Sequence, residues 1–370
     1  MALNCGIVGL PNVGKTTIFQ ALSGSKAETA NYSFSTINPN VGIVNVNDKR
    51  LFALAETFKP KRTIPATVEF VDISGLVKGS SRGEGLGNQF LAHIRDVGVI
   101  AHVVRCFDDP DIIHVANKID PDSDIETINI ELALADLDSL ARRRERAEKS
   151  RKSQVKAEQK LAETTLEALD KINPLLENGQ PARHAALTDD ERSAVYDCHF
   201  ITMKPQLYVC NVDENFFKSG ENAYVTAVRQ RARAEASDAV VIAGKFEAEL
   251  CGLEDDADRL AFMEDIGLTE SGLSALIHSA YKLLGLRTFF TAGEDECRAW
   301  TVHAGDTAPK AAGVIHTDFE KGFIKAEVYT FDDIVKYGSE AKIKEAGKYR
   351  LEGKEYVVQD GDVMFFKFNV

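Results

Sequence analysis

The sequence predicts an α/β protein with a mainly parallel sheet, a long helical insertion and a small C-terminal α+β unit. Three observations support this prediction. Short apolar runs alternate with helical patterns in the first half of the chain, apolar residues recur at helical spacing over 130–200, and short strands with turn signals return over 285–370. Alternating strands and helices indicate βα units, which build parallel sheets.

Six apolar runs have the character of strands in this sheet, at 5–8, 41–46, 68–73, 97–104, 206–210 and 239–243. Between the fourth and fifth runs we expect two long helices that fold back on each other, interrupted at Asn173-Pro174 and at 179–181. Thr188 and Glu191 have the spacing of a capping box, which would open the returning helical arm. A helix around 270–284 is expected to precede the final unit.

Composition narrows the class of protein. The 370 residues are 44% hydrophobic and 27% charged, and no apolar run approaches the ~20 residues of a membrane helix. The formal net charge of -13 argues against binding nucleic acid over the whole surface, because neutralising phosphates requires clustered Lys and Arg. The six cysteines lack CxxC or metal-ligand spacing, which indicates reduced thiols. Because the first motif leaves no room for a signal peptide, we expect a cytoplasmic protein that enters no membrane.

One segment departs from this acidic average. The stretch 141–160 contains nine Lys or Arg and three Glu, a local excess of +6. Two interpretations remain open for it: an ordinary solvated helical face, or a contact surface for RNA phosphates.

The clearest motif lies at 9–16, where Gly-Leu-Pro-Asn-Val-Gly-Lys-Thr matches the P-loop pattern GxxxxGK[ST] directly after an apolar strand. The glycines let successive backbone N–H groups point at the phosphates of a nucleotide. Lys15 supplies charge to the β- and γ-phosphates, and the Thr16 hydroxyl is placed to ligate Mg²⁺. The residues expected at the phosphates are Asn12, Val13, Gly14, Lys15, Thr16 and Thr17.

Two further elements follow in the order of a Ras-like nucleotide domain. Asp72 ends an apolar strand, where it can reach Mg²⁺ through water, and Gly75 can offer its N–H to a γ-phosphate. Thr36, in the polar loop 31–40, is placed to bind Mg²⁺ when the γ-phosphate is present. The sequence therefore predicts a nucleoside-triphosphate switch whose metal is held by Thr16, Thr36 and Asp72.

Together these motifs resemble the YchF / Obg-like ATPase family, over essentially the whole chain. The segments that carry the resemblance lie at 9–17, 31–36, 72–79, 85–91, 102–107, 298–302, 316–322 and 360–363. Ser33 and Asn38 depart from the Pro and Glu that are usual in the family. The resemblance implies a Ras-like P-loop domain at 1–129 and 202–284, an inserted coiled-coil arm at 130–201, and a ubiquitin-like TGS domain of the β-grasp, α+β type at 285–370.

The same resemblance implies an activity and partners. A member of this family would hydrolyse ATP in preference to GTP with Mg²⁺, and Asn12 would help to hold K⁺ near the phosphates. It would act as a switch in translation or the stress response. We expect it to be a monomer that docks on the ribosome, at the large subunit, through the basic arm and the TGS domain.

Two segments compete as the base-reading motif. The text at 117–120, Asn-Lys-Ile-Asp, is a literal NKxD, the guanine signature of GTPases. However, the strand at 97–104 ends only about a dozen residues earlier, too close for the helix that separates parallel strands. The segment 211–214, Asn-Val-Asp-Glu, follows a later strand and matches the family's NxxE. It lacks the lysine of NKxD, and its acid is one methylene longer, so the paired acceptor geometry that favours guanine is lost. Asn211 can pair with the adenine N6 amine and N7. The expected base contacts are Asn211, Val212, Glu214, Ala243 and Gly244.

The catalytic group is harder to assign. Ras-like enzymes usually place Gln directly after the glycine at 75 to orient the attacking water, and Leu76 stands there instead. The resemblance makes His114 a candidate for positioning the water near Gly75 and Leu76, although a histidine flanked by aliphatic residues is often simply packed. We expect slow turnover. Two rival functions stay open: a GTPase that reads guanine through 117–120, and a nucleotide-gated binding scaffold whose hydrolysis is incidental.

Overall fold

The computed structural model describes residues 3–24, 40–73, 86–115, 118–220, 222–253 and 255–369. Thr36, Gly75, Leu76 and Asn117 lie outside these described residues. The described chain divides into two compact units. The first is drawn from 1–25, 30–42 and 69–280, and the second from 43–68 and 281–370. The second unit therefore combines the C-terminal part of the chain with an early segment.

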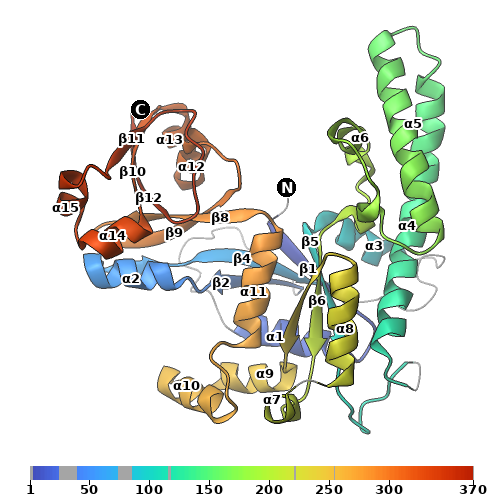
Figure 1. The fold of residues 1–370 in the computed structure, drawn as a ribbon, viewed down its shortest axis with the longest axis horizontal. Coiled ribbons are helices and arrows are strands. Elements are labelled where there is room, and N and C mark those ends of the chain that lie inside the picture. The colour runs from blue at the N-terminus through green and yellow to red at the C-terminus, as the bar shows by residue number, and fades with distance from the viewer. Residues whose placement is uncertain are drawn as a thin grey trace. The chain divides into compact units, whose positions relative to one another are not determined.

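The first sheet has the strand order β2-β4-β1-β5-β6-β7 (Figure 1). Its strands are β1 Asn4–Val8, β2 Val41–Val46, β4 Ala66–Asp72, β5 Val99–Arg105, β6 Gln206–Asn211 and β7 Asp238–Ile242. Strand β1 pairs in parallel with β4 and β5, β5 pairs in parallel with β6, and β6 with β7. The predicted parallel sheet is confirmed. Strands β5 and β6 are buried along their whole length, as expected for central strands covered on both faces.

Several helices follow the strands of this sheet along the chain. They are α1 Lys15–Gly24, α3 Leu86–Asp96, α7 Asn215–Ser219, α8 Ala223–Ala234, α9 Gly244–Gly252, α10 Asp256–Asp265 and α11 Gly272–Leu283. One core cluster joins Tyr208 of β6, Val225 of α8 and Phe246 of α9. The helix expected around 270–284 is α11.

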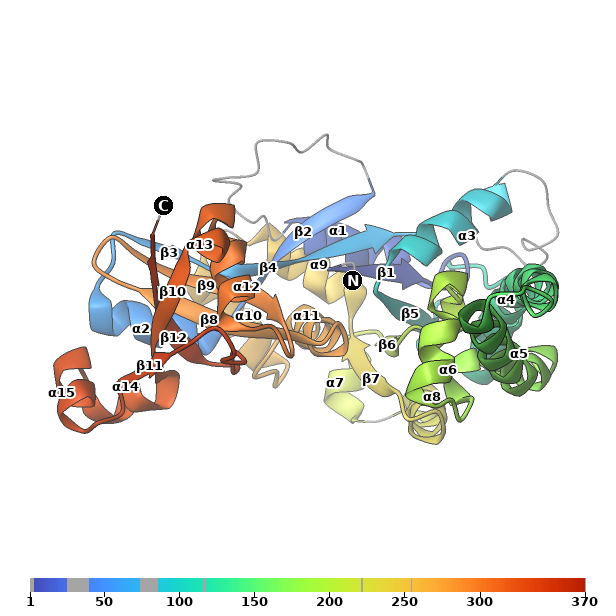
Figure 2. The same cartoon turned by 90° about the horizontal axis from the view of Figure 1, so that it is seen from above.

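The helical insertion is a hairpin of α4 Pro121–Ser150 and α5 Lys156–Glu177, which lie side by side in both views (Figures 1 and 2). Leu140, Leu169 and Ile172 belong to its buried core. The basic stretch 141–160 spans the end of α4, the connection and the start of α5. Its exposed cations are Arg142, Arg146, Lys149, Arg151, Lys152, Lys156 and Lys160.

The first helix of the insertion begins earlier than predicted, at Pro121 rather than near 130. The Asp120 side chain caps it by accepting a hydrogen bond from Ser123 N, and Pro121 stands in the first turn, where a missing N–H has no cost. The acidic first turns carry little apolar periodicity, which is why the sequence pattern did not reveal them.

The predicted break at Asn173-Pro174 is wrong, because α5 continues to Glu177. Pro174 removes one helical N–H. Its helical neighbours Ile172 and Leu176 are both buried, and their packing outweighs that loss.

The predicted capping box is confirmed. Glu191 N donates to Thr188 Oγ1 at 3.2 Å, and Thr188 N donates to Glu191 Oε2 at 2.8 Å. It opens only the short helix α6 Asp189–Ala194, so the return to the sheet is not another long helix. Short 3₁₀ turns complete the return at η2 Ala182–His184, η3 Tyr196–Cys198 and η4 Ile201–Met203. The buried Asp136 of α4 fixes the last of these turns by accepting from Thr202 N.

The second unit has a sheet of its own, in the order β11-β10-β12-β8-β9-β3. Its strands are β3 Arg62–Ile64, β8 Leu286–Ala292, β9 Glu296–His303, β10 Phe323–Thr330, β11 Arg350–Glu352 and β12 Asp362–Phe368. Its helices are α2 Lys49–Phe58, α12 Ala308–Ile315, α13 Thr317–Lys321, α14 Phe331–Tyr337 and α15 Glu340–Glu345. The predicted C-terminal α+β unit is present, with Phe289 and Met364 in its core.

The sequence pattern did not anticipate that α2 and β3 contribute to this second unit. Strand β3 pairs in parallel with β9, and Arg50 of α2 donates to Asp360 Oδ2 at 2.6 Å. Arg50 also lies over the ring of Phe290, 5.3 Å from its centroid.

All six cysteines are free thiols, of which Cys5, Cys106, Cys210 and Cys297 are buried. Within the described residues, no helix combines the length and the hydrophobicity needed to cross a bilayer.

Candidate nucleotide-binding site

A cavity of about 770 Å³ lies beyond the carboxyl ends of the parallel strands β1, β5, β6 and β7, the edge at which open α/β sheets bind ligands. Its lining comes from the turn after β1 and the start of α1, the loop after β5, the end of β6, and the start of α9. In that order the lining residues are Asn12, Gly14, Lys15, Thr16, Thr17, Phe107, Asp108, Asp109, Ile112, Asn211, Val212, Asp213, Glu214, Asn215, Ala243, Lys245 and Phe246.

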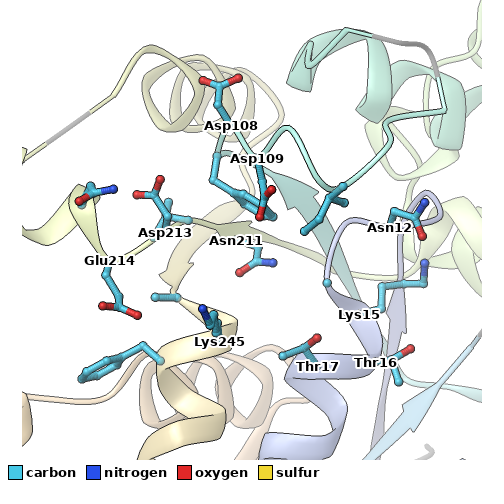
Figure 3. A pocket seen from close by; sticks show the side chains of 17 residues that line it. Asn12, Lys15, Thr16, Thr17, Asp108, Asp109, Asn211, Asp213, Glu214 and Lys245 are labelled. Carbon is cyan, nitrogen blue, oxygen red and sulfur yellow. The ribbon is translucent and has the colours of Figure 1, made fainter.

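The side chains at the two ends of this cavity differ in charge. Figure 3 shows Lys15 and Thr16 together at one end, whereas Asp213 and Glu214 lie at the other. Asp109 approaches from the loop after β5. The cationic end suits phosphates, and the acidic end suits hydrogen-bond donors on a base.

Glycine is required at both ends of the P-loop. Gly9 and Gly14 have φ of 154° and 96°, and a Cβ atom on Gly9 would lie 2.5 Å from the carbonyl oxygen of Val103. The Lys15 ammonium lies over this turn and donates to the carbonyl oxygens of Gly9 (2.9 Å) and Leu10 (2.7 Å). Burial lowers the pKa of Lys15, and the nearby carboxylate of Asp72 opposes that shift.

Asp72, the last residue of β4, is suited to hold a cation. Its side chain is buried, and among the described residues its Oδ1 atom has no hydrogen-bond partner. Burial raises the pKa of Asp72, with Lys15 opposing the shift. A buried carboxylate oxygen without a partner and a threonine hydroxyl at Thr16 are the oxygen donors that Mg²⁺ prefers, so these residues fit the predicted metal. The third predicted ligand, Thr36, lies outside the described residues.

Asn211 connects the P-loop to the start of α9. Its Nδ2 donates to the carbonyl oxygen of Val13 at 2.9 Å, and its Oδ1 accepts from Gly244 N at 3.0 Å. The side chain is buried, and after these two bonds to described residues one amide N–H and one oxygen lone pair remain for a ligand. Val13 and Gly244 do not line the cavity themselves, but this amide holds both beside it.

The described residues of the NKxD segment, 118–120, do not line this cavity. Lys118 and Asp120 pair with each other at 3.1 Å. The Asp120 carboxylate serves as the N-cap of α4. The segment 211–214 lines the cavity, and none of the described residues 118–120 of the competing motif does.

His114 is buried beside the first turns of the helical insertion. Its Nε2 lies 2.9 Å from Asp124 Oδ2, and both side chains are almost completely buried. Burial raises the pKa of Asp124, and the neighbouring His114 opposes that shift. His114 does not line the cavity in this conformation.

Comparisons with known proteins agree with this geometry. Residues 4–139 match the family model MMR_HSR1, described as 50S ribosome-binding GTPase, and residues 286–369 match YchF-GTPase_C, described as a protein of unknown function (DUF933). The chain is 55% identical to the ribosome-binding ATPase YchF of Haemophilus ducreyi and 53% identical to that of Pasteurella multocida, each over 100% of both chains. This chain belongs to the YchF family.

A solved YchF structure supports the same assignment. The Schizosaccharomyces pombe YchF GTPase superposes with a TM-score of 0.88 at 36% identity, covering 98% of this chain and 97% of that one. The resemblance and the fold class predicted from the sequence are therefore confirmed: a P-loop α/β domain, a long helical insertion formed by α4 and α5, and a C-terminal TGS-like domain. The names of these relatives differ in the nucleotide, because the bacterial proteins are called ATPases and the yeast protein is called a GTPase.

Most of the predicted YchF site residues lie together. Those that line the cavity are Asn12, Gly14, Lys15, Thr16, Thr17, Asn211, Val212, Glu214 and Ala243. The predicted Gly75, Leu76 and Thr36 lie outside the described residues.

Sequence reasoning missed one wall of the YchF cavity, the loop after β5 with Phe107, Asp109 and Ile112. A signal for it existed. Polar residues that directly follow a buried parallel strand share the edge of the sheet that carries the P-loop. Lys245 and Phe246, just after the predicted Ala243 and Gly244, also belong to the lining.

Proposed function

We propose that this chain is a Mg²⁺-dependent ATPase that binds ribosomes and uses its nucleotide state as a switch. The main observation behind this proposal is the cavity, which is lined both by the P-loop and by the Asn-Val-Asp-Glu segment at 211–214. Support also comes from the full-length relatives, which are named ribosome-binding ATPases.

At the phosphates, the backbone N–H groups of 12–17 cradle the triphosphate, and Lys15 compensates the β- and γ-charges. Thr16, Thr36 and Asp72 would hold Mg²⁺, which would supply positive charge to the phosphates. We assign the contact with the γ-phosphate to the N–H of Gly75, as expected from the sequence. Asp72 Oδ1 has no hydrogen-bond partner within the described part of the chain, which supports its share of this role.

At the base, we assign recognition to Asn211, Val212 and Glu214, backed by Ala243 and Gly244. The amide N–H and the oxygen lone pair that Asn211 has left can pair with N7 and the N6 amine of adenine. The motif lacks the lysine of NKxD, so ATP is preferred and GTP binds more weakly. The rival GTPase reading needs 117–120 at the base, but Asp120 is engaged as a helix cap.

Hydrolysis is slow in the isolated protein. Leu76 cannot orient water, and His114 would have to leave its buried contact with Asp124 to do so. We retain His114 as the water-positioning candidate, acting beside Gly75 and Leu76, and K⁺ near Asn12 as an accessory ion. If His114→Ala hydrolyses ATP at the wild-type rate, this assignment is wrong.

The ribosome is contacted through the exposed cations of 141–160 and the C-terminal TGS-like domain, at the large subunit. This assignment is supported by the local excess of +6 in a chain of net charge -13. We divide the working parts of the protein into a nucleotide domain at 1–129 and 202–284, an arm at 130–201 and a TGS domain at 285–370. The protein acts as a cytoplasmic monomer.

Titration of the purified chain with ATP and with GTP, each with Mg²⁺ and with EDTA, tests the proposal. We expect saturable, Mg²⁺-dependent binding that is tighter for ATP. Equal or tighter binding of GTP would favour the GTPase reading. ATPase rates with and without ribosomes then separate the switch from the scaffold, because a scaffold would show no stimulation on ribosomes.

A further inference from the structure

Arg105, the last residue of β5, is buried with 1% of its surface exposed. Its hydrogen-bond partners among the described residues are all backbone carbonyls. Nε donates to Phe107 O at 3.1 Å, one terminal nitrogen to Ile112 O at 2.9 Å, and the other to Asp109 O at 3.0 Å. Its guanidinium carbon also lies 4.7 Å from the centroid of the Phe107 ring.

These three acceptors belong to residues that line the nucleotide cavity. An apolar side chain could fill the same volume without the cost of burying a charge. The planar guanidinium instead satisfies three carbonyls in fixed directions, which a lysine ammonium on its flexible stem cannot do in the same way. The arginine therefore sets the shape of the loop that forms this wall.

Other side chains hold the remainder of the loop 106–113. Asn222 Nδ2 donates to Cys106 O at 2.9 Å, and Asn12 Nδ2 donates to Ile113 O at 3.1 Å. The hydroxyl of Tyr224 donates to the carboxylate of Asp108. The loop is thus fixed at both ends, and Arg105 fixes its middle.

The chemistry of this wall suits a nucleoside and not a polyphosphate. Asp108 and Asp109 would repel phosphate groups, whereas the half-buried Phe107 offers an aromatic surface to a purine. We propose that Arg105 is a positioning residue for nucleoside recognition, which acts by holding the Phe107 wall against the bound nucleoside. This inference rests on the proposed nucleotide-binding function.

Two ligands separate positioning from general damage: Mg·ATP, which uses the wall, and inorganic triphosphate with Mg²⁺, which uses the P-loop alone. In Arg105→Lys and Arg105→Met we expect the Kd for ATP to rise about tenfold or more, with the Kd for triphosphate within about twofold of wild type. Arg144→Met, which removes an ion pair to Asp170 on the arm, is the matched control and should change neither affinity.

Unchanged ATP affinity in both Arg105 variants, or equal weakening of both ligands, would overturn the inference. If the variants do not fold, as judged by loss of a cooperative melting transition, Phe107→Leu takes their place. It removes the ring that Arg105 is proposed to hold against the nucleoside, so a selective rise in the Kd for ATP supports the inference, whereas an unchanged Kd overturns it. Failure of the wild-type chain to bind ATP at all would instead overturn the proposed function.

Discussion

A Cβ atom on Gly14 would lie 2.1 Å from Nδ2 of Asn211. The P-loop and the end of β6 therefore approach so closely that only hydrogen fits between them. Gly14 also has φ of 96°, a conformation that residues with a side chain rarely adopt. Asn211 and Val13 are 198 positions apart in sequence. The hydrogen bond from the Asn211 side-chain amide to the Val13 carbonyl therefore joins two distant segments into one site.

Gly14→Ala is expected to weaken ATP binding by about 100-fold or more, because the methyl group displaces the Asn211 amide and strains the turn that presents the backbone N–H groups. The measurement is the Kd for Mg·ATP. Gly24→Ala, at the end of the same helix, is the control, since its Cβ would meet its nearest neighbour at an ordinary 3.7 Å. Similar affinities in the two variants would contradict the geometric argument.

Asn211→Ala is expected to destabilise the folded protein as well as the complex. The carbonyl of Val13 and the N–H of Gly244 would both lose their hydrogen-bond partner. Each of these groups that water does not reach would lower the free energy of unfolding by about 1–3 kcal/mol. Chemical denaturation measures the free energy of unfolding, and parallel titrations measure the preference for ATP over GTP. Asn215→Ala, which also lines the cavity, is the control. A variant of Asn211 that kept full ATP preference would remove this residue from base recognition.

Asp120→Ala separates the two candidate base motifs. Because Asp120 caps α4, we expect a loss of about 1 kcal/mol in stability with unchanged affinity for ATP and GTP. Thr188→Ala, which removes the N-cap of α6, is the matched control for the effect of losing a cap. A drop in GTP affinity confined to Asp120→Ala would show that 117–120 reads the base.

The parts predictable from sequence were those with local signals. The P-loop is a contiguous motif, and β5 and β6 are continuous apolar runs, so the sheet and the phosphate end of the cavity could be anticipated. Strand β3 has three residues and no buried position, which gives no pattern to detect, and its place beside β9 is decided by pairing across the second unit.

The roles of Arg105 and His114 depend on contacts within the loop after β5 and with the first turn of α4, for which the sequence offers no pattern. Arg105 looks like one more strand residue until its three carbonyl partners are known. His114 and Asp124 stand ten positions apart, across the start of a helix whose first turns the pattern did not reveal, so their buried contact was not foreseeable.

Glu247 of α9 provides a pH-dependent prediction close to the cavity. It follows the lining residue Phe246 and accepts hydrogen bonds from the N-terminus of α11, including Gly272 N. Burial raises the pKa of Glu247 from 4.5 to about 7, opposed by the N–H groups of Gly272 and Leu273 and by the hydroxyl of Ser271.

The sign of the effect follows from the direction of that shift. Between about pH 4.5 and 7 the folded state keeps a proton on Glu247 that the unfolded state has lost, so this group's contribution to stability falls as the pH rises through that window. The full difference is on the order of 3 kcal/mol, and above pH 7 it no longer changes. Glu247→Gln cannot titrate, so the free energy of unfolding of wild type minus that of Glu247→Gln should decrease from pH 5 to pH 7.5. Glu249→Gln, on the exposed side of the same helix, should show no such pH dependence, and a flat difference for Glu247→Gln would mean that this carboxyl is ionised in the folded protein throughout the range.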